Sequence, residues 1–315
     1  MNQESIMKVV NKMQDHMLLG SVYDDIMKKT KYHDEKLEFL YNVMTAQKHR
    51  MLYYKKLKKE YLEKCTEERP WEYKSKEYHP DVVWFMWLQG MDQAPEIVRT
   101  CYKALQKNLP DKRIVFLSKE NLSEYIELPD YIMEKHRKGI IGNAHFSDLI
   151  RLELLIRYGG YWIDSTVLCT DDAILREIES DSLFMYSFYY FGFNPEIMET
   201  NNWLVYSTTN NNILCLEQKF LYTYWQKMTR PVDYFLFHLF MTIATEFYKE
   251  EYQKMPIVSQ ADAHVLATYI YDPFDMHKYN ILKHTTGIHK LSTRFEEDKL
   301  GEGTFYDFII RKENY

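Results

Sequence analysis

Hydrophobic and polar positions predict alternating strands and helices from about residue 80 onwards. A continuous apolar run at 82–88 is typical of a buried parallel strand, and a second strand is expected at 114–117. Between these strands, Pro95 is expected to begin a helix whose apolar positions recur at the helical period. Strand, helix and strand at this spacing favour βαβ units, and therefore an α/β fold with a sheet of the nucleotide-binding type.

The stretch from 145 to 166 has the clearest pattern in the chain. Apolar residues at the helical period share one face of 145–158, and the Gly159–Gly160 pair is expected to end this helix. Residues 161–163 have the composition of a strand, and Asp164 stands where that strand would end. Because open α/β sheets build ligand sites at such strand ends, we expect Asp164 to belong to a site.

The remaining pattern divides the chain into two regions. Further helices are expected at 173–179, 214–227 and 233–248, further strands at 183–186 and 203–207, and short alternating elements at 256–258, 261–268 and 281–291. Residues 1–75 are rich in Lys, Glu, Met and Leu, without glycine after Gly20 or proline before Pro70, which is typical of helices. We therefore expect a helical N-terminal region at 1–75 and an α/β domain at 76–315.

Composition and charge narrow the class of protein. The 315 residues are 46% hydrophobic, which suits a globular protein, and the formal net charge of −6 argues against nucleic-acid binding. The four cysteines show neither a CxxC pair nor zinc spacing, which favours reduced thiols in a cytosol. No apolar run approaches the roughly 20 residues needed to cross a bilayer, and the first residues lack a secretory signal. We therefore expect a cytoplasmic protein, at most peripheral at the inner face of the cell membrane.

A basic stretch with interleaved aromatic residues runs from 48 to 64. One interpretation is a peripheral contact with anionic lipid headgroups of the membrane. The alternative is a solvated helix face that packs on the main domain, because a run of charges is by itself weak evidence for a partner.

Three charged residues of the central stretch have the chemistry of a ligand site. Asp148 and Arg151 are three residues apart, so they share a helix face that could hold a sugar hydroxyl and neutralise a phosphate. The alternative is a surface ion pair of little consequence. Asp164 could ligate a divalent cation that bridges a diphosphate, and the alternative is a turn aspartate that caps the next segment.

These residues belong to a longer motif. In this chain the motif reads Trp87-Leu88-Gln89-Gly90, then Ser147-Asp148, Arg151, Leu155, Tyr158-Gly159-Gly160, Trp162, Asp164 and Thr166. It resembles the motif of the capsular polysaccharide synthesis proteins, which are related to the family 32 glycosyltransferases with the DXD sugar-binding region. The resemblance covers about residues 82–170, with weaker similarity as far as about residue 291.

The resemblance implies a GT-A fold, a nucleotide-diphosphate sugar donor that is most often a UDP-sugar, and Mn²⁺ or Mg²⁺ as cofactor. Trp87 would stack near the uracil, Asp148 and Arg151 would contact the donor sugar, and Asp164 would be the first aspartate of DXD. Thr166 replaces the second aspartate, and a hydroxyl is a poorer metal ligand than a carboxylate. The donor-binding residues implied in this way are Trp87, Gln89, Ser147, Asp148, Arg151, Asp164, Ser165 and Lys290.

Two later segments add candidates by resemblance. The segment 284–291 is similar to the HxxGxxKPW signature of related retaining GT-A enzymes, which implies that His284 ligates the metal and Lys290 contacts the diphosphate. His289 is a second candidate for the metal. Asp233 begins a DYFxxH segment that recurs in the capsular proteins, which implies a place in the donor-sugar pocket. The alternative for Asp233 is a helix cap.

The resemblance thus implies a glycosyltransferase that moves a hexose from a UDP-hexose to a saccharide acceptor in cell-surface polysaccharide synthesis, with retention of configuration. Asp164, Asp233 and Arg151 are the predicted catalytic residues, and Asp164 with His284 or His289 the predicted metal ligands. The expected acceptor is a lipid-linked saccharide. Two alternatives stay open: a sugar-phosphate transferase of the same pathway, and a non-catalytic partner of a polysaccharide assembly complex.

Overall fold

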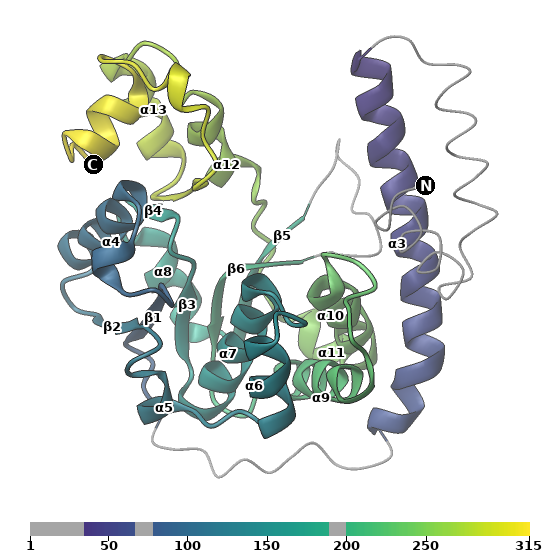
Figure 1. Cartoon of the computed structure of the whole chain (residues 1–315). Helices are drawn as coiled ribbons and strands as arrows, with labels where there is room; N and C mark the ends of the chain where they lie inside the picture. The colour runs from purple at the N-terminus through teal and green to yellow at the C-terminus, as the bar shows by residue number, and fades with distance from the viewer. Residues whose placement is uncertain (1–34, 67–77, 189–199) are drawn as a thin grey trace.

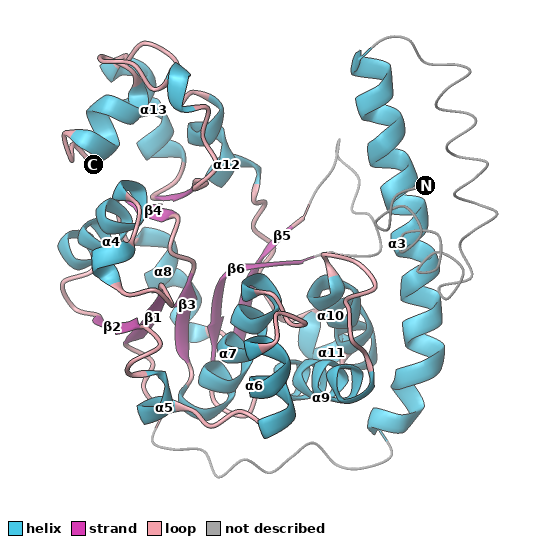
Figure 2. Ribbon diagram, viewed as in Figure 1, coloured by secondary structure: helices cyan, strands magenta, loops and turns pink. Residues whose placement is uncertain are grey.

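The structure is a computed structural model that describes residues 35–66, 78–188 and 200–315 (Figure 1). A five-stranded sheet lies at its centre, between two layers of helices (Figure 2). The strands are β1 (Val82–Met86), β2 (Arg113–Leu117), β3 (Gly160–Ile163), β4 (Val167–Cys169), β5 (Leu183–Ser187), β6 (Thr200–Ser207) and β7 (Ile288–Lys290). The α-helices are α3 (Glu35–Thr66), α4 (Glu96–Asn108), α5 (Leu122–Tyr125), α6 (Asp130–Arg137), α7 (Asn143–Tyr158), α8 (Ala173–Glu177), α9 (Asn212–Lys227), α10 (Leu236–Phe247), α11 (Lys249–Tyr252), α12 (Ala261–Thr268) and α13 (Met276–Thr285).

The central sheet has the strand order β2-β1-β3-β6-β5. β1 pairs in parallel with β2 and with β3, whereas β6 runs antiparallel to both β3 and β5. The chain passes from β1 to β2 on one side of β1 and then returns to β3 on its other side. Ligand sites of open α/β sheets lie outside the carboxyl ends of the strands at such a reversal of strand order.

Alternate residues of β1 face opposite layers of helices. Trp84 belongs to the core formed with α7, α9 and α10, whereas Val83 and Phe85 belong to the core formed with α4 and α8. All five residues of β1 are buried, as expected for a strand covered on both faces. The predicted α/β fold is therefore confirmed, with a sheet flanked by helices and a helical N-terminal region, and it is consistent with the GT-A type.

The connection from α7 to β3 is fixed by two glycines. α7 ends at Tyr158, and Gly159 and Gly160 have positive φ angles of 70° and 82°. A Cβ atom on Gly160 would lie 2.4 Å from the backbone oxygen of Val82, so a larger residue does not fit there. This connection sets where β3 begins, and therefore where Asp164 leaves the sheet.

Several predicted elements have different bounds in the structure; β6, for example, begins at Thr200 rather than at residue 203. β1 ends at Met86 rather than at residue 88, because Gly90 N donates to the Trp87 carbonyl oxygen at 3.0 Å and closes a turn. α10 begins at Leu236 rather than at Asp233. The region that the pattern divided into short elements near the C-terminus contains the helices α12 and α13 and the strand β7.

The basic stretch lies on α3, which packs along α9 and α10 (Figure 1). Tyr54, Leu57 and Tyr61 are buried in the core shared with those helices. Lys58 Nζ pairs with Glu246 Oε2 of α10 at 2.6 Å. The packing on the main domain, which the alternative interpretation of this stretch requires, is therefore observed.

The N-terminal region predicted at 1–75 is described only in part. Residues 1–34 and the boundary predicted at residue 75 lie outside the described residues. Within the ranges that the structure describes, no helix is both long and apolar enough to cross a membrane.

Candidate functional site

The carboxyl ends of β1 and β3 lie side by side, because these two strands pair in parallel. Asp164 follows β3 directly, and its backbone N–H donates to the carbonyl oxygen of Trp203 in β6 at 2.8 Å. β4 and β7 form a small antiparallel sheet that places Lys290 opposite Val167. Side chains from segments far apart in the sequence therefore meet where the strand order reverses.

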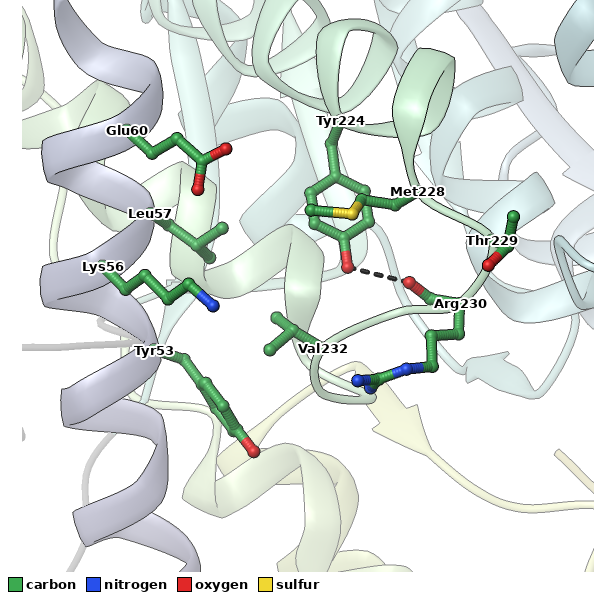
Figure 3. A pocket seen from close by; sticks show the side chains of 9 residues that line it. All are labelled: Tyr53, Lys56, Leu57, Glu60, Tyr224, Met228, Thr229, Arg230 and Val232. Atoms are coloured by element: carbon green, nitrogen blue, oxygen red, sulfur yellow. Dashed lines mark hydrogen bonds between the residues drawn. The ribbon is translucent and has the colours of Figure 1, made fainter. Parts of the chain in front are cut away.

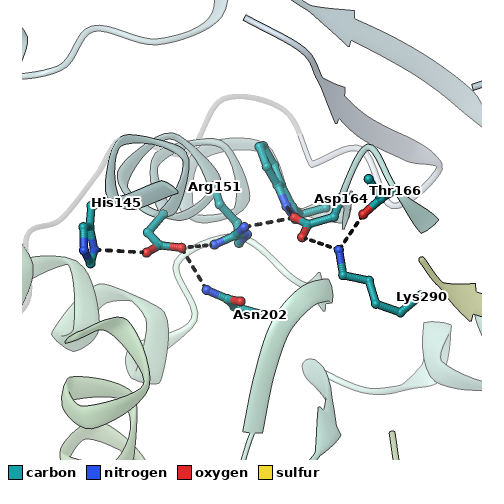
Figure 4. Close-up of polar contacts among 8 residues, drawn as sticks. His145, Arg151, Asp164, Thr166, Asn202 and Lys290 are labelled. Carbon is teal, nitrogen blue, oxygen red and sulfur yellow. Dashed lines mark hydrogen bonds and ion pairs between the residues drawn. The ribbon is translucent and has the colours of Figure 1, made fainter. Parts of the chain in front are cut away.

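Asp164 is the centre of a hydrogen-bond network (Figure 4). Its Oδ1 accepts from Arg151 Nη2 at 3.1 Å and from Trp162 Nε1 at 2.8 Å. Its Oδ2 accepts from Lys290 Nζ at 3.1 Å, and the same Nζ donates to Thr166 Oγ1 at 2.7 Å. Both oxygens of this carboxylate are therefore bound by cationic side chains, one from α7 and one from β7.

Asp148 lies on the other side of Arg151. Arg151 Nη1 donates to Asp148 Oδ1, which also accepts from Asn202 Nδ2 of β6 at 2.8 Å. Asp148 Oδ2 lies 3.8 Å from His145 Nδ1. Asp148 is 8% exposed and Arg151 is 3% exposed, so the alternative of a surface ion pair is wrong. The guanidinium instead bridges two carboxylates in the interior.

Burial and ion pairing set the charges of this network. Burial raises the pKa of Asp148 to about 6, although the Arg151 guanidinium acts in the opposite direction. Burial acts in the same way on Asp164, but Lys290 and Arg151 outweigh it and hold the pKa of that carboxyl below its usual range. Burial also lowers the pKa of His145, so this imidazole is neutral at pH 7. The network therefore consists of two carboxylates balanced by two cations.

Both cations keep donors for a ligand. Arg151 has five N–H groups and uses two of them within the network, one on Nη1 and one on Nη2, while its Nε is closed off from solvent. Lys290 has three N–H groups and uses two of them within the network. The guanidinium carbon of Arg151 lies 4.8 Å from the centre of the Trp162 ring, which further fixes its position. Two fixed cations of this kind can neutralise a phosphate with little reorganisation.

The other predicted donor-binding residues lie on the same elements. Trp87 and Gln89 lie in the turn after β1, where Gln89 is exposed. Trp87 Nε1 is buried and has no hydrogen-bond partner in the described part of the chain. Ser147 lies on α7 and Ser165 in the turn after β3, and both are partly exposed. Their roles in donor binding stay predictions.

Within the described residues, neither His284 nor His289 contacts Asp164. His284 is exposed in the last turn of α13 and lines a separate cavity between α12 and α13. His289 is fully buried in β7, where its Nε2 lies 3.4 Å from Thr170 Oγ1. Successive residues of a strand point to opposite faces, so Lys290, and not its neighbour His289, points to Asp164.

The residues around Asp164 do not fit a divalent cation. Both oxygens of its carboxylate accept hydrogen bonds from cations, and the Thr166 hydroxyl accepts one from Lys290. In the ranges that the structure describes, no group of three His, Cys, Asp or Glu side chains is placed to hold a metal ion. A Mn²⁺ or Mg²⁺ ion held by one carboxylate and by donor phosphates would have to displace Lys290 from Asp164 Oδ2, so the cofactor implied by the resemblance does not fit the side chains as they are placed here.

Asp233 lies just before α10 and beside α3. Its Oδ1 accepts from the backbone N–H of Phe235 at 2.8 Å and lies 3.4 Å from Arg50 Nε. These contacts form a turn before α10, whose N-cap is Phe235 without a side-chain cap hydrogen bond, so Asp233 is not the helix cap of the alternative interpretation. Asp233 also acts to raise the pKa of His145, which places its charge near the His145 end of the network. Its role in catalysis stays a prediction.

The sequence patterns missed two polar residues next to Asp148. Asn202 binds the Asp148 carboxylate from β6, and the strand predicted from the sequence began one residue later. Glu217 of α9 is fully buried, with neither carboxylate oxygen bonded in the described part of the chain. Burial first, and then the Asp148 charge, raise the pKa of Glu217 well above its usual range. The available signal was the position of Glu217 directly after the apolar run at 213–216.

Comparison with known proteins agrees with the motif. A family model described as capsular polysaccharide synthesis protein matches residues 33–309. A search of curated proteins finds no match for the chain. The matched range includes β1, α7, β3 and β7, and therefore every residue of the network around Asp164. The chain belongs to the capsular polysaccharide synthesis protein family, and its role lies in polysaccharide synthesis.

Proposed function

We propose that the chain is a glycosyltransferase that moves a hexose from a UDP-hexose to a saccharide acceptor in cell-surface polysaccharide synthesis, with retention of configuration. The observation that supports this most is the Arg151–Asp164–Lys290 network at the reversal of strand order. Two cations beside a carboxylate suit a sugar diphosphate, whose charge lies on the diphosphate and whose hydroxyls need acceptors. The family's role in polysaccharide synthesis suits the same ligand.

The donor would lie across the carboxyl ends of β1 and β3. The turn after β1 offers Trp87 for the base, since an aromatic ring can stack on uracil. The spare N–H groups of Arg151 and Lys290 would bind the diphosphate. Asp148 and Asp164, held by these cations, would accept hydrogen bonds from the hexose hydroxyls.

Transfer breaks the bond between the anomeric carbon and the oxygen of the β-phosphate, and negative charge develops on that oxygen. Arg151 and Lys290 would stabilise this charge, and donors of this kind contribute about 10² to 10³ in rate each. The acceptor hydroxyl forms the new bond on the same face of the sugar and gives its proton to the departing phosphate oxygen. Such a transfer requires no separate protein base.

A screen of nucleotide sugars tests this function. We expect a UDP-hexose to raise the thermal unfolding temperature and to release UDP slowly by hydrolysis, whereas the matching free hexose does neither. Mass spectrometry of the product with a saccharide acceptor is expected to show the mass of one added hexose. A phosphodiester product would instead indicate the sugar-phosphate transferase, and no binding of any nucleotide sugar would indicate the non-catalytic partner.

We also propose that α3 contacts an anionic lipid surface, which would bring a lipid-linked acceptor to the site. Lys48, Lys55 and Lys59 are exposed on α3. Met44 and Leu52 lie on the same helix and are 72% and 44% exposed. Lysines around exposed apolar side chains are typical of helices that lie at a membrane interface.

A cavity beside α3 supports this contact. It has a volume of about 250 Å³ and lies between α3 and the loop after α9, with Lys56, Arg230 and the acidic Glu60 among its lining residues (Figure 3). The loop is held in place by Tyr224, whose hydroxyl donates to the backbone oxygen of Arg230 at 2.8 Å. Two cationic side chains at one cavity suit the phosphate of a lipid headgroup.

Vesicle sedimentation tests the lipid contact. We expect the chain to bind vesicles that contain phosphatidylglycerol and not vesicles of phosphatidylcholine alone. Reversing two charges, Lys55→Glu with Lys59→Glu, is expected to weaken binding about 30-fold or more, because each basic residue near an anionic surface contributes about 1 kcal/mol. Lys254→Glu with Lys278→Glu, at exposed sites away from α3, is the matched control. Equal losses in the two double variants would contradict a specific role of α3.

A further inference from the structure

The Lys290 ammonium lies between two oxygens that would otherwise be the natural ligands of a metal ion. Lys290 Nζ is 3.1 Å from Asp164 Oδ2 and 2.7 Å from Thr166 Oγ1 (Figure 4). These are hydrogen-bond distances, and a divalent cation would need the same two oxygens at about 2.0 to 2.6 Å. An ammonium group and a metal ion cannot occupy this position together. We propose that Lys290, together with Arg151, supplies the positive charge at the donor diphosphate, so that donor binding requires no divalent cation.

The position of Lys290 is determined by the fold. β7 pairs with β4, which follows Asp164 after one turn, and Leu291 N donates to the Thr166 carbonyl oxygen at 2.9 Å. The alternation along β7 directs His289 into the core and Lys290 to Asp164. The Lys290 side chain is only 19% exposed. Its ammonium is therefore held at the site and is not a mobile surface charge.

The electrostatics of the site favour one ammonium over a metal ion. Arg151 already binds the other oxygen of Asp164, so a divalent cation would lie next to two positive side chains. Among the described residues neither His284 nor His289 offers a ligand at this position, so phosphate and water oxygens would have to supply the remaining ligands of a metal. With Lys290 in place, Thr166 suits the site, because its hydroxyl accepts from the ammonium without adding a second negative charge.

Lys290 keeps one N–H group that can bind the donor diphosphate. Asp164 and Thr166 accept two of its donors and leave one for a phosphate oxygen. Arg151 keeps one further N–H on each of Nη1 and Nη2. The two cations, whose charges Asp148 and Asp164 balance, thus offer the diphosphate hydrogen bonds in place of the coordination bonds of a divalent ion.

The test measures UDP binding by calorimetry on the full chain, and it rests on the proposed nucleotide-sugar function. We expect the Kd for UDP to agree within about twofold between buffer with EDTA and buffer with MnCl₂. Lys290→Met is expected to weaken binding by about 10- to 100-fold in EDTA, the range for loss of a charge-assisted hydrogen bond. Lys283→Met, at a partly exposed lysine of α13, is the matched control and is expected to bind as the wild type does.

A double variant gives a second readout. Lys290→Ala with Thr166→Asp removes the ammonium and restores a second carboxylate, so its UDP binding is expected to become dependent on MnCl₂. Wild-type binding that appears only with MnCl₂ would overturn the role of Lys290 and leave the glycosyltransferase proposal standing. An absence of UDP binding in both buffers would instead overturn the glycosyltransferase proposal. The wild-type comparison needs no variant, so it holds even if a substituted chain fails to fold.

Discussion

Replacing Asp164 with asparagine is expected to lower the rate of hexose transfer by a factor of about 10² to 10³ while the chain still folds. The substitution keeps the size of the side chain but removes the charge that Arg151 and Lys290 share. The amide presents only one acceptor oxygen, and its NH₂ group faces a residue that can only donate. One of the two cations therefore loses its bond to residue 164, keeps only its bond to Asp148 or to Thr166, and is held less firmly where it would meet the diphosphate.

The measurement is single-turnover transfer from a UDP-hexose, with thermal unfolding as the check on the fold. We expect a loss of stability of about 1 to 3 kcal/mol, since a buried hydrogen-bonding group is left without a partner. Asp172→Asn is the matched control, because it makes the same chemical change at an ion pair with the exposed Arg176. Wild-type turnover in the Asp164 variant would remove Asp164 from the mechanism.

Local periodicity was sufficient to find the elements that position Asp164. The helical spacing of apolar residues, the glycine pair and the aromatic strand composition placed α7 and β3 within two residues of their observed bounds. These signals are local, because a helix repeats every 3.6 residues and glycine alone tolerates the backbone angles at 159 and 160. The parallel direction of β1, β2 and β3 also follows from the strand–helix–strand order, but that order does not decide that β3 lies beside β1 rather than beside β2.

Burial of the Asp148–Arg151 pair depends on distant segments and was not evident from the sequence. A spacing of three residues is the same for a surface ion pair and for an interior one. The difference arises because α9 and α10, more than 60 residues later, cover the face of α7 that carries the pair. The contact between Asn202 and Asp148 also depends on distant segments, because Asn202 reaches Asp148 only through the pairing of β6 with β3.

The choice between the histidines and Lys290 was likewise a question of strand register. The similarity of residues 284–291 to a metal-binding signature names His284 but does not say which residues begin β7. In the structure β7 begins at Ile288 and pairs with β4 so that Lys290 lies opposite Val167. This register decides which face of the strand each side chain takes. His289 then faces the core, and Lys290 faces Asp164. A shift of one residue would exchange them.

The Arg151→Lys variant keeps the positive charge and is nevertheless expected to lose about 10² to 10³ in transfer rate. The planar guanidinium donates to Asp148 through Nη1 and to Asp164 through Nη2. A lysine ammonium is a single point charge on a longer flexible stem and cannot bridge both carboxylates in this geometry. One carboxylate then loses its ion pair with residue 151 and keeps only its other hydrogen bonds, which is expected to destabilise the fold by about 1 to 3 kcal/mol. Arg176→Lys, at an exposed ion pair, is the matched control.

The pH dependence of donor binding in the Arg151→Lys variant tests whether the site needs the guanidinium or only a positive charge. Burial raises the pKa of Asp148 to about 6 against the opposing effect of Arg151. If the Asp148 carboxylate binds the donor, wild-type affinity for a UDP-hexose is present above this pKa and is lost as the pH falls through about 6. Folding stability depends on pH in the opposite direction. Because the pKa of Asp148 is higher in the folded chain than in the unfolded chain, ionisation of this carboxyl lowers the free energy of unfolding as the pH rises from about 4 to about 6. Weaker pairing in the lysine variant raises the pKa of Asp148 further, so the acid limb of donor binding moves to higher pH. An acid limb that stays near pH 6 in the variant would contradict the bridging role of Arg151.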